Sequence, residues 1–163
     1  MGPCAPVSIM KLTAFTDYSL RVLMFLAADP DRRATISEIA AAFEVSEHHL
    51  TKVVHFLARS GWISTLRGKG GGMLLAMPAG EICIGRVVRD TEGAAMPAEC
   101  FSDAQSNCAI VACCQLKGVL AEAVNAFYAA LDGYTLADIT RNKTRLANVL
   151  HFQTLAKQAG TPR

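Results

Sequence analysis

With 163 residues, 52% of them hydrophobic and 18% charged, the chain has the composition of a globular protein with room for one domain, or for a small domain with an appendage. It has no apolar run of about 18 residues and no apolar N-terminal stretch of a secretory signal, so we expect a cytoplasmic protein without a membrane-spanning helix. The net charge of +2 is too small to indicate a class of partner. Residues 48–80, however, contain cations and no acid, and such a local excess of positive charge favours binding to a polyanion.

Three helices are predicted in the first 61 residues. Apolar residues recur at helical spacing from Thr13 to Ala28, where the sequence DPDRR ends the pattern. A shorter helix with an apolar face follows over 35–43, and Thr35 or Ser37 can cap its first turn. Ser46 can cap a third helix, which has leucines and valines on one side and mostly polar side chains on the other.

Residues 62–77 predict a β-hairpin. The β-prone runs WISTL and MLLAM flank a loop that contains four glycines and two cations. So many glycines weaken an ordinary hairpin, unless its loop must approach another backbone closely. A short helix, a turn, a polar-faced helix and a glycine-tipped hairpin, in this order, are typical of a winged helix-turn-helix. We therefore predict a DNA-binding domain over residues 10–92.

In such a domain the third helix enters the major groove and the wing meets phosphate or the minor groove of double-stranded DNA. The predicted DNA contacts come from these two elements: His48, His49, Thr51, Lys52, Arg67 and Lys69. The alternative is that this polar face is merely solvated, as most such faces are. Glu47 counts against the prediction because it would repel phosphate, although an acid suits the N-terminus of a helix.

Beyond the hairpin we expect a fourth helix over 79–93, a long fifth helix over 115–131 and a short sixth helix in TLADIT. The fifth helix carries an apolar stripe, formed by Leu116, Leu120, Ala123, Val124, Phe127 and Leu131. Because this helix lies outside the winged-helix core, its stripe needs a partner surface, and packing on its own domain is the alternative. Residues 115–141 are therefore interpreted as a dimerisation unit, and the basic tail of residues 142–163 is expected to fray. The predicted fold class is mainly α with a small β-hairpin wing.

Four of the six cysteines lie in the segment 93–114, which is interpreted as a cluster-binding loop. A reducing compartment disfavours disulfides, so clustered cysteines favour metal or redox chemistry. Thiolates hold iron–sulfur clusters, and a loop before a helix lets several of them converge. The spacing lacks the paired C-x₂-C knuckles of a zinc ribbon, which makes structural zinc less favoured. Cys83 lies between two isoleucines and is predicted to be in the core, and Cys4 has no predicted role.

Several segments together resemble the iron–sulfur winged-helix transcription regulators, the family that includes NsrR and IscR. They are LTAFTDYSLRVLMFLA, ISEIAAAFEVSEHHLTKVVHFLARSGWISTLRGKGGGMLLA, the cysteine-rich loop and CQLKGVLAEAVNAFYAALDGYTLADIT, within about residues 10–141. Members of the family usually begin where Met10 stands, so the resemblance implies that residues 1–9 are an N-terminal extension or a misassigned start. The resemblance implies a homodimer on a palindromic operator and three thiolate ligands, Cys100, Cys108 and Cys114. In the family the last cysteine directly precedes the xLK start of the long helix, which selects Cys114. Cys113 is then a spare thiol, an alternative ligand or a disulfide partner after cluster loss.

Within the family, the sequence resembles the NsrR type. IscR-type members place a histidine ligand three residues after the last cysteine, where Lys117 stands here. FTDYSLR, CQLK and YTLADI resemble NsrR, which implies a [4Fe-4S] cluster, with [2Fe-2S] as the alternative. The resemblance also implies that Asp17 is the fourth ligand, donated across the dimer to the partner's cluster. From residue type alone, Asp17 could equally stabilise the start of the first helix. Cys113 is the alternative candidate for the fourth ligand of the cluster.

The predicted function is that of a repressor, not an enzyme, which releases its operator when nitric oxide damages the cluster. A regulator of iron or iron–sulfur supply with the same architecture is the first alternative. A metal-free thiol redox sensor that uses Cys113 and Cys114 is the second. No C-x-x-C motif supports this second alternative, and vicinal cysteines form only strained disulfides.

Overall fold

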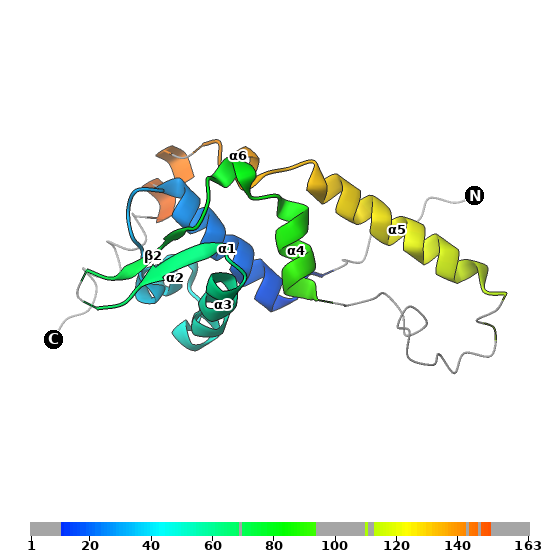
Figure 1. The fold of residues 1–163 in the computed structure, drawn as a ribbon, viewed down its shortest axis with the longest axis horizontal. Coiled ribbons are helices and arrows are strands. Elements are labelled where there is room, and N and C mark those ends of the chain that lie inside the picture. The colour runs from blue at the N-terminus through cyan, green and yellow to red at the C-terminus, as the bar shows by residue number, and fades with distance from the viewer. Residues whose placement is uncertain are drawn as a thin grey trace.

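The computed structural model describes residues 11–68, 70–93, 110, 113–142, 144–146 and 148–150. In chain order its elements are α1 (Ala14–Ala28), α2 (Ile36–Phe43), α3 (Glu47–Arg59), β1 (Ile63–Leu66), β2 (Gly72–Leu75), the 3-10 helix η1 (Ala79–Glu81), α4 (Ile84–Glu92), α5 (Gln115–Asp132) and α6 (Leu136–Ile139). The described part is mainly helical with one two-stranded antiparallel sheet, which confirms the predicted fold class. Figure 1 shows α1 to α4 and the hairpin gathered in one body, which α5 leaves as a long arm.

The first two helices begin with threonine caps, of which the sequence predicts the one at Thr35. The Thr13 side chain accepts a hydrogen bond from the backbone N–H of Thr16 at the start of α1. Thr35 and Glu38 form a reciprocal capping box at the start of α2. Ser46 does occupy the N-cap position of α3, but its side chain makes no capping hydrogen bond, so its predicted capping role is wrong.

The hairpin pairs in the register Ile63↔Leu75 to Leu66↔Gly72, and its second strand is also joined to the α1–α2 linker. Ala34 and Met73 exchange two backbone hydrogen bonds, with N···O distances of 3.1 and 2.8 Å. Gly72 has φ +147°, and a Cβ there would lie 2.9 Å from the carbonyl oxygen of Ala34. A glycine is therefore needed at position 72 because the wing approaches the chain's own backbone closely.

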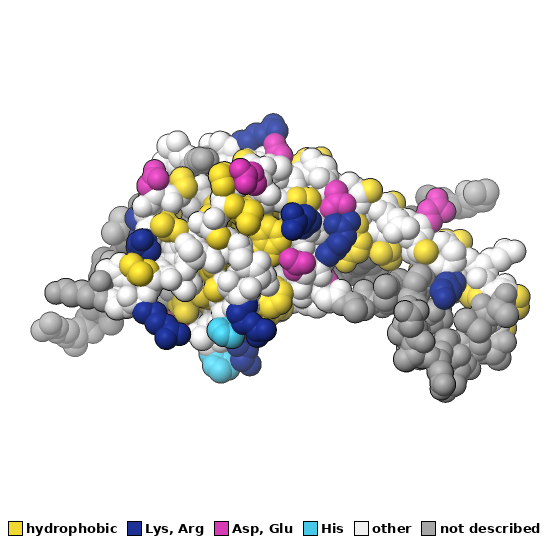
Figure 2. All heavy atoms as spheres, viewed as in Figure 1, with side chains coloured by type: hydrophobic (Ala, Val, Ile, Leu, Met, Phe, Trp, Pro, Cys, Tyr) yellow, Lys and Arg dark blue, Asp and Glu magenta, His cyan; other side chains and the backbone are white. Residues whose placement is uncertain are grey.

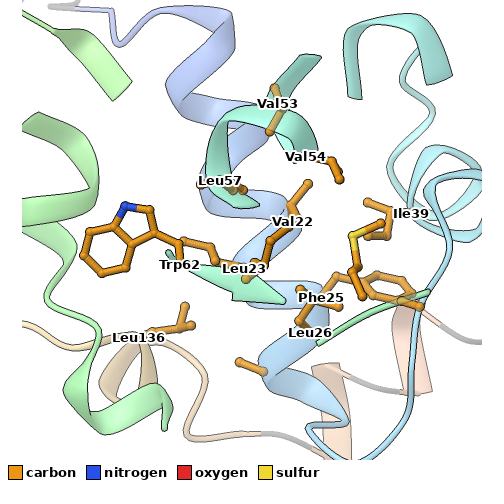
Figure 3. Close-up of a cluster of buried hydrophobic side chains, with 14 of the residues drawn as sticks. Val22, Leu23, Phe25, Leu26, Ile39, Val53, Val54, Leu57, Trp62 and Leu136 are labelled. Carbon is orange, nitrogen blue, oxygen red and sulfur yellow. The ribbon is translucent and has the colours of Figure 1, made fainter. Parts of the chain in front are cut away.

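Helix α1 runs through the hydrophobic core. Its Val22, Leu23 and Leu26 are buried and face side chains from α2, α3 and the hairpin (Figure 3). The core also includes Leu136 of α6 and Leu150, which are 0% and 5% exposed. Residues 144–146 and 148–150 are helical, so the expectation that the tail frays is wrong for this part of it.

The predicted fourth helix over 79–93 is broken into two pieces. Ile82 and Cys83, between η1 and α4, are extended and pair with the segment that enters α6. The N–H of Ile84 donates to the Tyr134 carbonyl at 3.0 Å, and that of Leu136 donates to the Ile82 carbonyl at 2.8 Å. Cys83 is only half-buried, and its thiol lies 3.6 Å from the Asp132 Oδ1 atom, so its predicted place in the core is wrong.

Helix α5 has 18 residues and none of them is buried. Near its C-terminal end, Phe127, Tyr128 and Leu131 pack partly against the core. Toward its N-terminal end, Leu116 is 61% exposed, so the described part of the chain does not cover the start of the apolar stripe. Val119, which lies outside the stripe, is 61% exposed as well. None of the described helices combines the length and the hydropathy that crossing a membrane requires.

Candidate nucleic-acid interface and cysteine site

Helix α3 separates its apolar and polar residues as its periodicity predicts. Its Leu50, Val53, Val54 and Leu57 are buried against the core. The predicted contact residues lie on the exposed side: His48, His49, Thr51 and Lys52. In Figure 2 the histidines lie beside Lys and Arg side chains at the lower edge of the molecule, over α3. The Thr51 hydroxyl donates to the Glu47 carbonyl at 2.8 Å, so its oxygen keeps only acceptor capacity for a ligand.

The first strand of the wing begins four residues after α3 ends, so the cations of the wing follow that helix closely in the sequence. Arg67 is exposed at the end of β1, and Lys69 lies outside the described residues. Gly68 and Gly70 have φ values of +95° and +77°, which side chains rarely adopt. The turn at the wing tip therefore favours glycine at both positions and leaves a slim backbone that can approach DNA.

Asp17 lies in the first turn of α1, and its carboxylate is engaged within its own protomer. Arg21, one turn later, makes an ion pair with it at 2.8 Å, and both side chains are about two-fifths exposed. The Arg21 guanidinium also lies 6.0 Å from the Tyr18 ring centre. This ion pair was not among the sequence predictions, although its i,i+4 spacing is a signal that could have revealed it.

The start of α1 adjoins the polar face of α3. The rings of Tyr18 and His49 stack with their centres 6.4 Å apart. Beside them lies an open hollow of about 190 Å³, lined by Ala14, Phe15, Tyr18, His49, Lys52 and Val53. The structure thus brings the helix end that carries Asp17 next to the predicted DNA-contacting residues, although about thirty positions separate Asp17 from His49 in the sequence.

The cysteine site is only partly described. Cys114 is half-buried at the N-cap position of α5 and makes no capping hydrogen bond there, while Cys113 is exposed and its thiol lies 3.5 Å from the Ile110 carbonyl oxygen. Cys100, Cys108 and most of the predicted cluster-binding loop 93–114 lie outside the described residues. Within the described part, no three His, Cys, Asp or Glu side chains are grouped to hold a metal.

The residues present fit an iron–sulfur cluster in chemistry. Cys114 lies at the positive end of a long helix, which favours an anionic ligand such as a metal-bound thiolate. Within the described residues the Cys114 side chain makes no capping hydrogen bond, so its sulfur is not engaged at this helix end. Cys114 is therefore suited to hold iron as a thiolate, and the predicted donor set would add Cys100, Cys108 and the Asp17 carboxylate.

A hydrogen-bond network joins the start of α1 to the end of α4, where the chain enters the cysteine loop. The Glu92 carboxylate accepts from the Thr13 N–H at 2.8 Å and from its hydroxyl at 3.1 Å. The buried Thr16 donates to Thr91 at 2.9 Å. Burial raises the pKa of Glu92, but hydrogen bonds from Thr16 and Thr13 outweigh it and hold this pKa below its usual value. Sequence reasoning missed this network because its partners are more than 70 positions apart.

Residues 12–142 match the model of the Rrf2 family, described as iron-dependent transcriptional regulators. The chain belongs to the Rrf2 family. Two relatives, both named HTH-type transcriptional regulator NsrR, support this assignment. The Geobacillus kaustophilus protein is 46% identical over 86% of this chain and 97% of its own length. The Bacillus subtilis protein is 46% identical over 88% of this chain and 99% of its own length.

Solved structures agree with this Rrf2 assignment. Staphylococcus aureus CymR is 25% identical with a TM-score of 0.62, covering 78% of this chain and 95% of CymR. T. potens IscR shares the fold with a TM-score of 0.65 at 21% identity, covering 94% of this chain and 93% of IscR. The named relatives are transcriptional regulators, which confirms the predicted resemblance and the expectation of a DNA-binding regulator that is not an enzyme. Membership is also consistent with an iron–sulfur cofactor.

Proposed function

We propose that this Rrf2 protein is an NsrR-type repressor, which binds its operator while an iron–sulfur cluster is bound and releases it when nitric oxide damages the cluster. The observation that carries the proposal is the 46% identity to two proteins named NsrR over nearly their whole lengths. The exposed polar face of α3 and the glycine-tipped wing support the DNA-binding part. The cysteine at the N-cap of α5 supports the sensing part.

The proposed ligands are Cys100, Cys108 and Cys114 of one protomer and Asp17 of the partner subunit. They would hold a [4Fe-4S] cluster, with [2Fe-2S] as the alternative, and this group when bound supplies iron that nitric oxide attacks. A carboxylate is a harder ligand than a thiolate and is more easily displaced from iron, which suits a sensor. For ligation, Asp17 must leave Arg21, and an exposed ion pair of this kind is worth only about 1 kcal/mol or less.

The proposed assembly is a homodimer in which α5 faces a second copy of the chain. The N-terminal half of α5 carries exposed apolar side chains, and a two-fold axis would cover the stripes of both copies at once. The two winged-helix domains related by this axis would meet the two half-sites of a palindromic operator. The contact residues proposed on each domain are His48, His49, Thr51, Lys52, Arg67 and Lys69.

The wild-type protein tests the function directly. Purified without oxygen, it should show broad visible absorbance and retain a palindromic duplex that it has selected from a random library. Addition of nitric oxide should bleach this absorbance and weaken duplex binding at least about tenfold, because much of the specific affinity is lost. A colourless, iron-free protein that still binds its duplex tightly would contradict the proposal.

The description of the family as iron-dependent favours one alternative, a regulator of iron or iron–sulfur supply. The same binding assay separates the two functions. If an iron chelator makes the protein release the duplex as completely and as quickly as nitric oxide does, the supply regulator is favoured. Release by nitric oxide alone would favour the nitric-oxide sensor.

Replacing Arg67 by alanine should weaken binding of the selected duplex by about 1–3 kcal/mol if the guanidinium reaches a base edge. Arg67 is exposed at the end of β1, so the substitution should leave the fold intact. Arg141→Ala is the matched control, because Arg141 is 79% exposed just after α6, outside the predicted contact elements α3 and the wing, and should not alter binding. A Lys69 substitution should instead lower affinity evenly across sequences and flatten its salt dependence. Unchanged affinity for Arg67→Ala in a gel-shift titration would show that the wing assignment is wrong.

A further inference from the structure

Among the described residues, helix α5 packs against the rest of the protomer near its C-terminal end. Its neighbour there is α4, and Figure 1 shows the two helices meeting where the arm leaves the body. With a rise of about 1.5 Å per residue, the arm is about 27 Å long, so a tilt of roughly 10° at its base moves its far end by about 5 Å. The contacts between α4 and α5 therefore decide where the arm points.

Arg89 of α4 contacts two residues near the C-terminal end of α5. The two terminal nitrogens of Arg89 donate to the two carboxylate oxygens of Asp132, each at 2.6 Å. The same guanidinium lies 4.5 Å from the centre of the Tyr128 ring, one turn earlier on α5. A bidentate pair fixes the relative orientation of two groups as well as their distance, and the ring contact adds a second point of attachment.

Gly85, one turn before Arg89 on α4, allows this close approach. A Cβ at position 85 would overlap the Asp132 carboxylate and lie 3.0 Å from its backbone nitrogen. Gly85 does not have the positive φ that would otherwise favour glycine, since it lies inside a regular helix. Glycine lowers the helix propensity of α4, so its use here is explained by the proximity of Asp132. We call Gly85, Arg89, Tyr128 and Asp132 the α4–α5 clamp.

Helix α4 also contacts the winged-helix body, next to the wing and at the start of α1. The Trp62 indole N–H donates to the Asp90 carboxylate at 3.0 Å, and Trp62 immediately precedes β1 of the wing. Arg86 lies 5.6 Å from the centre of the same indole ring. Glu92 binds Thr13 at the start of α1, as described above. Helix α4 therefore moves with the wing and α1, and the clamp is the joint between this body and the arm.

We propose that the α4–α5 clamp is a specificity determinant, which sets the spacing between the two operator half-sites that the dimer accepts. This inference rests on the proposed function, because it requires dimerisation through α5. In a two-fold dimer the angle between α4 and α5 fixes the separation of the two wings and of the two reading helices. A displacement of about 5 Å exceeds the rise of about 3.4 Å per base pair, so a loosened joint should tolerate other spacings.

The test uses the anaerobically purified full-length protein and the palindromic duplex that the wild type selects from a random library. Duplexes with the central spacer lengthened or shortened by one or two base pairs form the series. The wild type should prefer one spacing about tenfold over its neighbours, and Arg89→Gln should reduce this ratio to about threefold or less. Asp132→Asn should do the same. The double variant should broaden the profile no further than either single variant, because the two substitutions remove the same ion pair.

Two controls separate the clamp from general damage. Arg141→Gln removes a local surface ion pair, with Asp138 three residues earlier at 2.6 Å, and should keep the wild-type spacing profile. Arg89→Lys keeps the charge but loses the bidentate geometry and should give an intermediate profile. Sedimentation should show that all variants remain dimers.

An unchanged, narrow profile for both Arg89→Gln and Asp132→Asn would overturn the clamp and leave the proposed function standing. A wild-type protein that is monomeric, or that selects no palindrome, would overturn the clamp together with the proposed dimer.

Discussion

Replacing Cys114 by serine should yield a folded protein that contains no iron–sulfur cluster. The hydroxyl of serine is a poor ligand for iron compared with a thiolate, and the two remaining proposed thiolate ligands, Cys100 and Cys108, cannot hold a cluster firmly. Cys114 is the N-cap of α5 and makes no capping bond, whereas serine is a favoured N-cap residue. The helix should therefore be retained or slightly stabilised. Iron content and visible absorbance after anaerobic purification measure the loss, and far-UV circular dichroism confirms the helix.

The other cysteines serve as controls for this substitution. Cys83→Ser should keep the full iron content, because the Cys83 thiol faces Asp132 at the base of α5. Cys108→Ser should abolish the cluster as Cys114→Ser does. A Cys114→Ser protein with unchanged iron and spectrum would show that its neighbour Cys113 is the ligand instead.

The fourth ligand is decided by a pair of variants in the same assay. Asp17→Ala should shift the absorption spectrum and change the reaction with nitric oxide while leaving the fold intact, since its ion pair with Arg21 is exposed. Cys113→Ala should leave both unchanged. The opposite result, a spectral change for Cys113→Ala alone, would make the fourth ligand sulfur and weaken the NsrR-type proposal.

Replacing Leu116 by glutamate should convert the dimer to monomers. In the proposed interface the new carboxylate would be buried without a partner, which costs at least about 3 kcal/mol and weakens dimerisation more than about a hundredfold. Leu116 is 61% exposed in the protomer, so the protomer itself should fold normally. Sedimentation at micromolar concentration measures the change, and binding to the palindromic duplex should fall with it.

Asn125→Glu is the matched control, because helical geometry places position 125 nearly opposite the apolar stripe on the exposed part of α5. It should remain dimeric. Phe127→Glu is a less specific test than Leu116→Glu, because Phe127 packs partly against the core of its own protomer. An unchanged dimer for Leu116→Glu would place the interface elsewhere on the molecule.

Much of the candidate site could be predicted from local sequence patterns. The exposed face of α3 follows directly from its periodicity, since burial of Leu50, Val53 and Leu57 forces the intervening polar residues outward. The wing tip follows from its four glycines, three of which adopt positive φ values. The ligand roles of Cys100, Cys108, Cys114 and Asp17 stay predictions, since they rest on the family resemblance and two of these cysteines lie outside the described residues.

The sequence by itself determined the elements whose stabilising interactions are local. Helices α1 and α2 start at Thr13 and Thr35 because a capping hydrogen bond reaches only three residues, so the residues that make it are neighbours in the sequence. The β1–β2 hairpin likewise depends on two β-prone runs and a short loop between them. Such signals can be found without knowing what the rest of the chain does.

Tertiary structure alone decided how these elements are joined. The break at Ile82–Cys83 arises because that segment pairs with Thr135 and Leu136, some 50 residues away, and helix propensity cannot report such a partner. The same holds for the Arg89–Asp132 pair and for the Thr13–Glu92 hydrogen bonds, whose partners are 43 and 79 positions apart. Only the packing of α4 between α1, the wing and α5 brings these groups into contact, so no local pattern in the sequence records them.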